Sequence, residues 1–208
     1  MIAGTATPGA WVDTSWKLTP SVLSALKQAG KVGVMRYVPL PGNASAGDIS
    51  GGEMADILVA DLELLLVQHV RRPPWLPQAY SGLLDGQAAA DSARAVGYPP
   101  GAHVFLDLEG AAGQPSDAEK WTNDWAAAVK CEGYLAGLYV GYSALLSPLE
   151  LYALPDFDCY WSDAGPRQVA TRGFAIKQGA EVTIGGVTFD LDEVRQDLLG
   201  GLPVAARA

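Results

Sequence analysis

Short apolar runs typical of buried strands alternate along this chain with stretches of helical periodicity. A first strand is expected at 11–13, and Thr19, Pro20 and Gly30 mark the cap, the first turn and the end of the helix that follows. The near-continuous apolar run 62–70 is typical of a strand that is buried on both faces. Further strands are predicted at 32–39, 62–70, 103–109, 135–142, 159–162 and 173–178, and further helices at 53–60, 82–96, 116–131 and 148–153.

The last part of the sequence carries a hairpin signal. The β-rich segments 182–184 and 187–189 flank Gly185-Gly186, a pair that suits a two-residue hairpin turn. After the hairpin we expect a last strand through Asp190, a final helix at 193–199 and a loose tail at 200–208.

Alternating strands and helices predict parallel strands joined by right-handed crossovers. About eight strands within 208 residues favour a closed barrel over an open sheet. No glycine-rich phosphate loop follows the first strand, which argues against a dinucleotide-binding fold. The sequence therefore predicts an α/β fold, a single-domain (β/α)8-type TIM barrel over residues 1–208, with a β-hairpin leading into the last strand.

Composition and charge narrow the partners. Hydrophobic residues make up 49% of the chain, enough for a large core, and the net charge is −9 without a basic run. An acidic surface cannot neutralise phosphates, so we expect no nucleic-acid or membrane partner. No signal peptide or membrane span is visible, so we expect a protein that is made in the cytoplasm and reaches the cell wall by release or another route. We also expect a monomer. Cys131 and Cys159 lack metal-ligand spacing and are expected to be small buried hydrophobic residues.

Carboxylates are the strongest chemical signal. Barrel enzymes place their sites at the C-terminal ends of the strands. Five acids are expected there: Asp13, Asp107, Glu109, Asp190 and Asp192. Asp107 and Glu109 share the face of one strand, about 6.6 Å apart along it. Crowded carboxylates raise one another's pKa, so one of them can hold the proton that cleavage of a glycosidic bond needs. We assign Glu109 as the proton donor, with Asp107, Asp13 and Asp190 as its partners, and this chemistry calls for no cofactor or metal.

Aromatic and amide side chains at the same end suit a sugar cleft. The rings of Trp16, Trp75, Tyr142 and Trp161 could stack on sugar faces, although ordinary packing explains such rings equally well. The predicted substrate contacts are Tyr139, Tyr142, Trp161, Gln178, Asp192 and Trp75. Other interpretations stay open: Asp107 or Asp190 could cap a turn or pair with Arg36 or Lys177, and His69 could be a satisfied structural histidine.

The order of these motifs resembles the family 25 glycoside hydrolases (Chalaropsis-type lysozymes) and the related bacterial glycoside-hydrolase-like barrel domains of unknown function. The resemblance covers nearly the whole chain. The alanine-rich segment 82–97 is similar to a helix of the uncharacterised group. The other matching segments are Trp11-Val12-Asp13-Thr14-Ser15, Phe105-Leu106-Asp107-Leu108-Glu109, Gly137-Leu138-Tyr139-Val140-Gly141-Tyr142, Tyr160-Trp161-Ser162, Gln178 and Phe189-Asp190-Leu191-Asp192.

The resemblance implies cleavage of the β-1,4 bond after N-acetylmuramic acid in peptidoglycan, as by an endolysin. It implies that Glu109 donates the proton and that Asp107 orients the acetamido group of the substrate or stabilises charge. Asp13 and Asp190 would line the site. The chain departs from the lysozyme pattern at Lys177, where an aromatic residue is usual, and at Asp192, where asparagine is common.

Two other functions remain open. A non-catalytic barrel would bind glycans or serve as a structural module, for example in a phage tail. A metal-dependent phosphodiesterase would use the clustered carboxylates to hold Mg²⁺ or Ca²⁺. No histidine follows the first strand to act as its acid or base, which disfavours that function. The leading hypothesis is a glycoside hydrolase acting on peptidoglycan or another amino-sugar polymer.

Overall fold

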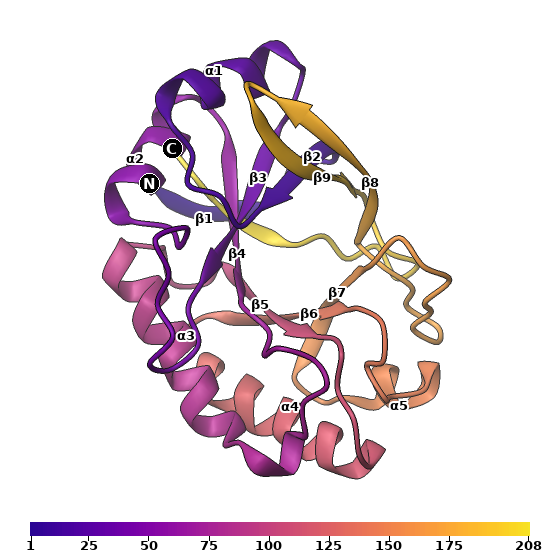
Figure 1. Ribbon diagram of the computed structural model, residues 1–208. Coiled ribbons are helices and arrows are strands. Elements are labelled where there is room, and N and C mark those ends of the chain that lie inside the picture. Colours follow the sequence, from indigo (N-terminus) through magenta and orange to yellow (C-terminus); the bar gives the residue numbers. More distant parts are fainter.

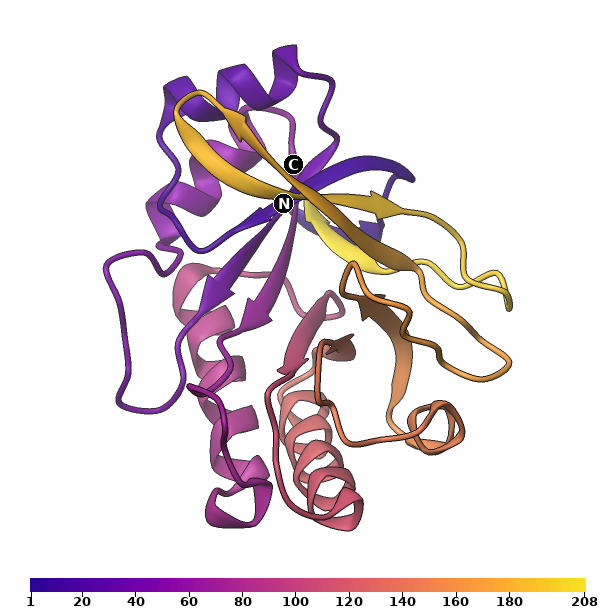
Figure 2. The ribbon, with the colours of Figure 1, turned by 45° about the vertical axis from the view of Figure 1, so that its right-hand side comes forward.

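Eight strands close into a barrel in the computed structural model, which describes all residues 1–208 (Figures 1 and 2). Pairing of β4 (Glu63–Gln68) with β5 (His103–Leu108) completes the ring. This confirms the predicted single-domain α/β barrel with its hairpin. The barrel strands are β2 (Gly9–Thr14), β3 (Gly33–Val38), β4 (Glu63–Gln68), β5 (His103–Leu108), β6 (Leu135–Val140), β7 (Phe157–Ser162), β8 (Ile176–Ile184) and β9 (Val187–Val194).

One barrel strand runs against the others. The strands β2 to β8 run parallel to one another, whereas β9 is antiparallel to both β8 and β2. The prediction of uniformly parallel strands is therefore wrong for β9, because the two-residue turn at Gly185-Gly186 sends the chain straight back. As a result β9 descends from the barrel mouth, and Asp190 lies opposite Asp13 while Asp192 lies opposite Trp11, one layer deeper.

Helices cover the outside of the barrel at most of the crossovers. The side chains of Thr19, Ser50 and Ser81 cap the first three helices, and Ser147 forms a capping box with Glu150. The connection from β7 to β8 contains no helix. No helix has the length and apolar character needed to cross a membrane. The helices are α1 (Pro20–Gln28), α2 (Gly51–Val59), the 3-10 turn η1 (Pro77–Ala79), α3 (Gly82–Val96), α4 (Pro115–Cys131) and α5 (Pro148–Ala153).

Alternation along the strands builds two apolar layers. Inward residues such as Trp11, Met35, Phe105 and Trp161 fill the barrel, and outward residues pack against the helices. The Trp11 ring lies directly over Gly33 and the Phe105 ring over Gly137, at positions where a Cβ would clash with the ring. The pattern of large and absent side chains thus fixes how neighbouring strands pack.

The end of the chain corrects two predictions. Residues 193–199 form no helix, because β9 continues to Val194, and the tail is ordered as β10 (Val204–Arg207). The strand β10 pairs with β1 (Ile2–Thr5) and touches β4 at Leu64. Ala205 and Ala206 are fully buried there, so the tail covers the N-terminal end of the barrel. Burial of small apolar side chains orders a segment whose composition alone carries no strand signal.

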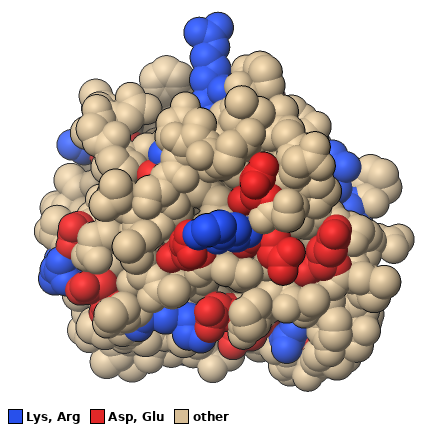
Figure 3. All heavy atoms as spheres, turned by 90° about the horizontal axis from the view of Figure 1, so that it is seen from below, with Lys and Arg blue, Asp and Glu red and all other residues tan.

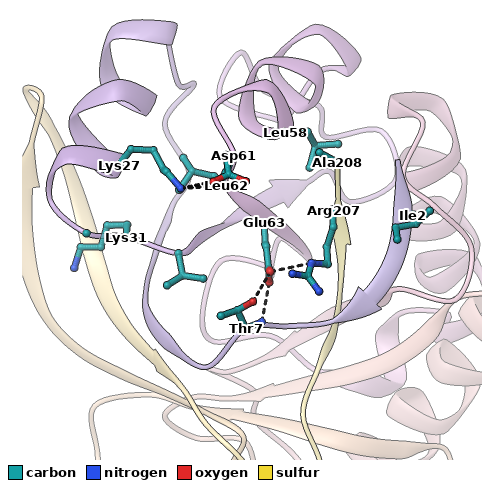
Figure 4. A pocket seen from close by; sticks show the side chains of 12 residues that line it. Ile2, Thr7, Lys27, Lys31, Leu58, Asp61, Leu62, Glu63, Arg207 and Ala208 are labelled. Atoms are coloured by element: carbon teal, nitrogen blue, oxygen red, sulfur yellow. Dashed lines mark hydrogen bonds and ion pairs between the residues drawn. The ribbon is translucent and has the colours of Figure 1, made fainter.

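Charged side chains secure this closed end (Figure 4). Glu63 accepts hydrogen bonds from the backbone and hydroxyl of Thr7 and pairs with Arg207 at 3.0 Å. Lys27 pairs with Asp61 at 2.9 Å, and both side chains line the cavity that Figure 4 shows at this end. The contacts of Glu63 tie both ends of the chain to β4.

The contact between α3 and α4 depends on small residues. A Cβ at Gly86 would lie 2.4 Å from the carbonyl oxygen of Trp125 and 2.9 Å from the Cβ of Ala128. We expect Gly86→Ala to lower the free energy of unfolding by about 1–3 kcal/mol, because the two helix backbones must separate. Gly52→Ala in α2 meets nothing within 4 Å and should leave stability unchanged or raise it by up to about 1 kcal/mol. Urea unfolding of both variants measures the difference, and equal stabilities would contradict it.

Candidate active site

The barrel opens at the C-terminal ends of its parallel strands. The loops that follow β4 and β5 run toward the lower side of Figure 1, and Figure 3 looks onto that side. Acidic side chains gather near the middle of this face around a basic one. The predicted carboxylates lie near one another inside this opening, since Asp190 pairs with Asp13 across two strands and the charge of Asp13 acts on both Asp107 and Asp192.

Asp13 lies at the centre of a hydrogen-bonded chain. Its carboxylate accepts the Tyr37 hydroxyl at 3.2 Å and the Gln178 amide at 3.0 Å. The Tyr139 hydroxyl in turn donates to the oxygen of Gln178 at 3.0 Å. Burial raises the pKa of Asp13 to about 6, the charge of Asp190 adds to this rise, and the bonds from Gln178 and Tyr37 oppose it. Asp13 is thus held in one orientation and is ionised above about pH 6.

Asp107 and Glu109 end β5 and face the same opening. Asp107 is 6% exposed, and its Oδ1 has no hydrogen-bond partner. Burial, together with the charges of Glu109 and Asp13, raises the pKa of Asp107 well above its usual range. The pKa of Glu109 is raised by burial and by the charge of Asp163. Both carboxyl groups are therefore disposed to carry protons.

The absence of a side chain at Gly141 makes room for the Glu109 side chain. A Cβ at Gly141 would lie 2.5 Å from both the Cβ and Oε2 of Glu109. On the other side, the indole of Trp75 donates a hydrogen bond of 2.7 Å to the carbonyl oxygen of Glu109. Gly110 follows with a positive φ of 62° and packs against Pro73. The loops after β4 and β6 thereby fix the backbone at Glu109 from both sides.

Asp190 and Asp192 come from the returning strand β9. Burial and the charge of Glu181 raise the pKa of Asp190. The Oδ1 of Asp192 accepts the indole N–H of Trp161 at 2.8 Å, and its Oδ2 has no partner. Burial and the charge of Asp13 raise the pKa of Asp192 well above its usual range. Asp192 therefore lies beneath the opening, inside the barrel.

No basic side chain neutralises the five carboxylates. None of them takes part in an ion pair. Arg36 points out of the barrel and pairs with Glu53 at 2.7 Å, so it is not the counterion of Asp107 or Asp190. Lys177 is exposed on the outer face of β8. Among the mouth residues, Asp13, Tyr37, Asp190 and Glu181 line a cavity of about 210 Å³, with Trp16 at its edge.

The predicted substrate contacts separate into three groups. Tyr139 and Gln178 reach Asp13 through the chain of hydrogen bonds. Tyr142 is 45% exposed and keeps an open ring. Trp161 is 1% exposed and Trp75 is 4% exposed, so neither offers a face to a sugar, in contrast to the prediction. Trp161 fills the barrel interior, and Trp75 packs edge-on against Trp121 with ring centroids 4.8 Å apart.

Three residues outside the predicted site also act on the cluster. Tyr37 has the inward parity of Met35, which could have indicated its position next to Asp13. Glu181 reaches Asp190 across an irregularity between Gln178 and Glu181 that alternation cannot predict. Asp163 ends β7, and only the folded barrel brings it next to Glu109.

Two other features of the mouth were left open by the sequence. His69 stacks on Tyr37 with ring centroids 4.7 Å apart and bonds Asp48 at 2.8 Å, so it is a satisfied histidine. No three histidine, cysteine, aspartate or glutamate side chains come together in an arrangement that could hold a metal ion.

Comparison with known families gives one match. A model described as "Rv2525c-like, glycoside hydrolase-like domain" covers residues 24–195 of this chain. That span includes Asp107, Glu109, Asp190 and Asp192, and it begins after Asp13. No curated protein sequence matches the chain.

Solved structures show the same fold at low identity. An uncharacterized protein from B. stearothermophilus is 16% identical with a TM-score of 0.69, over 93% of this chain and 99% of that one. The Tat-secreted protein Rv2525c from Mycobacterium tuberculosis, solved with HEPES, is 17% identical with a TM-score of 0.66, over 91% and 98%. The modular autolysin LytC from Streptococcus pneumoniae is 12% identical with a TM-score of 0.63, over 88% of this chain and 46% of that one.

The raised pKa of Asp107 makes stability depend on pH. Below the usual aspartate range the group is protonated in both the folded and the unfolded chain. As pH rises, the unfolded chain ionises first, so the folded state loses stability by about 1.4 kcal/mol per pH unit until its own pKa is reached. We expect Asp107→Asn to become more stable relative to the unaltered protein between pH 4 and pH 7. Thermal unfolding measures this difference, and a difference independent of pH would contradict the assignment.

Proposed function

Since the chain belongs to the Rv2525c-like, glycoside hydrolase-like family, we propose that it hydrolyses an amino-sugar polymer, with peptidoglycan as the substrate, by carboxylate acid–base catalysis. The observation that carries this proposal is the pairing of half-buried Glu109 with buried, unpartnered Asp107 at the end of β5. Carboxyl groups that hold protons near neutral pH, beside others that ionise, are what cleavage of a glycosidic bond requires.

In the proposed reaction Glu109 donates its proton to the glycosidic oxygen. The bond between that oxygen and the anomeric carbon then breaks, and the leaving sugar departs as an alcohol. Positive charge develops at the anomeric carbon and ring oxygen, and ionised Asp13 and Asp190 stabilise it. Water adds its hydroxyl to the anomeric carbon, and the proton that it loses returns the carboxylate cluster to its starting state.

Asp107 has a different part in this proposal. Its unpartnered Oδ1 can donate or accept a hydrogen bond once a substrate enters. An acetamido group on the sugar would satisfy that atom, which otherwise pays the cost of burial without a partner. This supports an N-acetylated amino sugar over a plain hexose at the position next to the cleaved bond.

The finer assignment is a muramidase of the family 25 type, acting as an endolysin-like enzyme on the cell wall. The order of motifs supports it, as does the shared fold with an autolysin, LytC, that has been solved with a synthetic peptidoglycan ligand. We propose that the site works outside the cytoplasm, where its substrate lies.

Glu109→Gln tests the proposal. The amide keeps the shape of the side chain but cannot donate the acid proton, so we expect release of soluble muropeptides from purified peptidoglycan to fall by at least about 100-fold. Mass spectrometry of the reduced products should identify muramic-acid reducing ends with the unaltered protein only. The exposed Glu119→Gln on α4 makes the same chemical change away from the site and should keep full activity.

The other candidate functions give different outcomes. A glycan-binding module would release nothing, and its affinity for peptidoglycan would be the same with Glu109→Gln. A metal-dependent phosphodiesterase would be inactivated by EDTA, whereas the proposed hydrolysis should persist in it. Absence of release by the folded, unaltered protein would refute the muramidase assignment.

A further inference from the structure

A second cavity lies beside the mouth, between the loops that follow β3 and β4. It has a volume of about 530 Å³, and its lining includes Leu40, Arg71, Arg72, Tyr80, Leu84 and Asp85. We call it the Arg72 groove. Tyr80 is 46% exposed and Leu84 is 64% exposed, so the groove combines open apolar surface with charge. Nothing in the acid–base chemistry described above uses it.

A fixed stack of side chains forms one wall of the groove. The Arg71 guanidinium lies 3.8 Å from the centre of the Tyr80 ring and pairs with Asp85 at 2.6 Å. Asp85 is 2% exposed, and its other oxygen accepts the indole N–H of Trp121 at 2.9 Å. Arg71 is therefore neutralised and immobile, and it presents Tyr80 as a rigid surface.

Arg72 is different from its neighbour. It is exposed, and it takes part in no ion pair and no side-chain hydrogen bond. Its five N–H donors are free to bind an anion with two parallel hydrogen bonds. The groove thus holds one uncompensated positive charge in a chain whose net charge is −9.

Two contacts connect this groove to the candidate catalytic strand. Pro73, the next residue, packs on Gly110, and Trp75 bonds the carbonyl oxygen of Glu109. The loop that carries Arg72 therefore also holds the backbone at Glu109, and a polymer that extends from Glu109 along this loop would meet Arg72. An anionic substituent on that polymer would be repelled by the five carboxylates of the mouth and attracted by the free guanidinium.

We propose that the Arg72 groove binds the peptide substituent of the glycan, with Arg72 pairing to a peptide carboxylate and Tyr80 and Leu84 contacting its small aliphatic side chains. This inference rests on the proposed function and adds to it a site that selects peptide-bearing over bare amino-sugar chains. A peptidoglycan stem peptide has this chemistry, since it joins alanine side chains to free carboxylates. Arg72 is a specificity-determining residue and takes no part in proton transfer.

Binding of three probes to the unaltered protein and to Arg72→Gln tests the inference by calorimetry. The probes are the disaccharide of N-acetylglucosamine and N-acetylmuramic acid with its tetrapeptide, the same disaccharide without peptide, and chitotriose. The disaccharides lack the bond that a muramidase cuts, so they report binding alone. We expect Arg72→Gln to weaken binding of the tetrapeptide form about five-fold, the effect of one exposed charge-assisted contact, and to leave chitotriose unchanged. Arg72→Lys should keep part of the affinity, and Lys31→Gln, which removes a charge at the opposite end of the barrel, should change nothing.

Each contrary outcome has one meaning. If Arg72→Gln weakens both disaccharides equally, Arg72 contacts a group that both disaccharides share and not the peptide, and the inference is overturned. If affinity for the tetrapeptide form is unchanged while all probes bind, the inference fails and the glycan function stands. If no probe binds to the folded, unaltered protein, the proposed function itself fails.

Discussion

The antiparallel strand β9 is the constraint on which the site depends. By pairing with β8 on one side and β2 on the other, it closes the barrel and fixes Asp190 opposite Asp13. A shift of one residue in this register would turn both β9 carboxylates out of the barrel. The same pairing places Asp192 one layer below, where only the Trp161 indole satisfies it. The convergence of carboxylates is thus a property of strand register more than of any loop.

Crowding these carboxylates has an energetic cost that the rest of the fold must offset. Burial raises the pKa of each of them, and no ion pair compensates for it. The molecule surrounds them with rigid parts: the filled barrel interior below, the hydrogen-bonded chain from Tyr139 to Tyr37, and the tail that closes the opposite end. An electrostatic cost of this kind, offset by well-packed surroundings, is typical of functional sites in general.

The loop between β4 and α3 connects the Arg72 groove to the backbone at Glu109. Trp75 holds the backbone at Glu109, while Arg71, Asp85 and Trp121 hold the base of the Arg72 groove. Sequence reasoning assigned Trp75 to the substrate, yet its ring is buried where it supports the loop. From sequence alone, a tryptophan at this position can either contact a substrate or pack inside the protein. Its packing against Trp121 decides between the two.

The sequence by itself determined most of the elements, the barrel and which acids lie in it. Those depend on local signals: caps such as Thr19 and Ser81, glycines after helices, alternation in 103–109 and the turn at Gly185-Gly186. Only the tertiary structure decided which partners those acids have. Tyr37, Glu181 and Asp163 reach the cluster from separate strands, and the tail 200–208 becomes a strand because distant β1 and β4 accept it. Burial, charge and pKa arise from residues far apart in the chain, so no local pattern of sequence contains them.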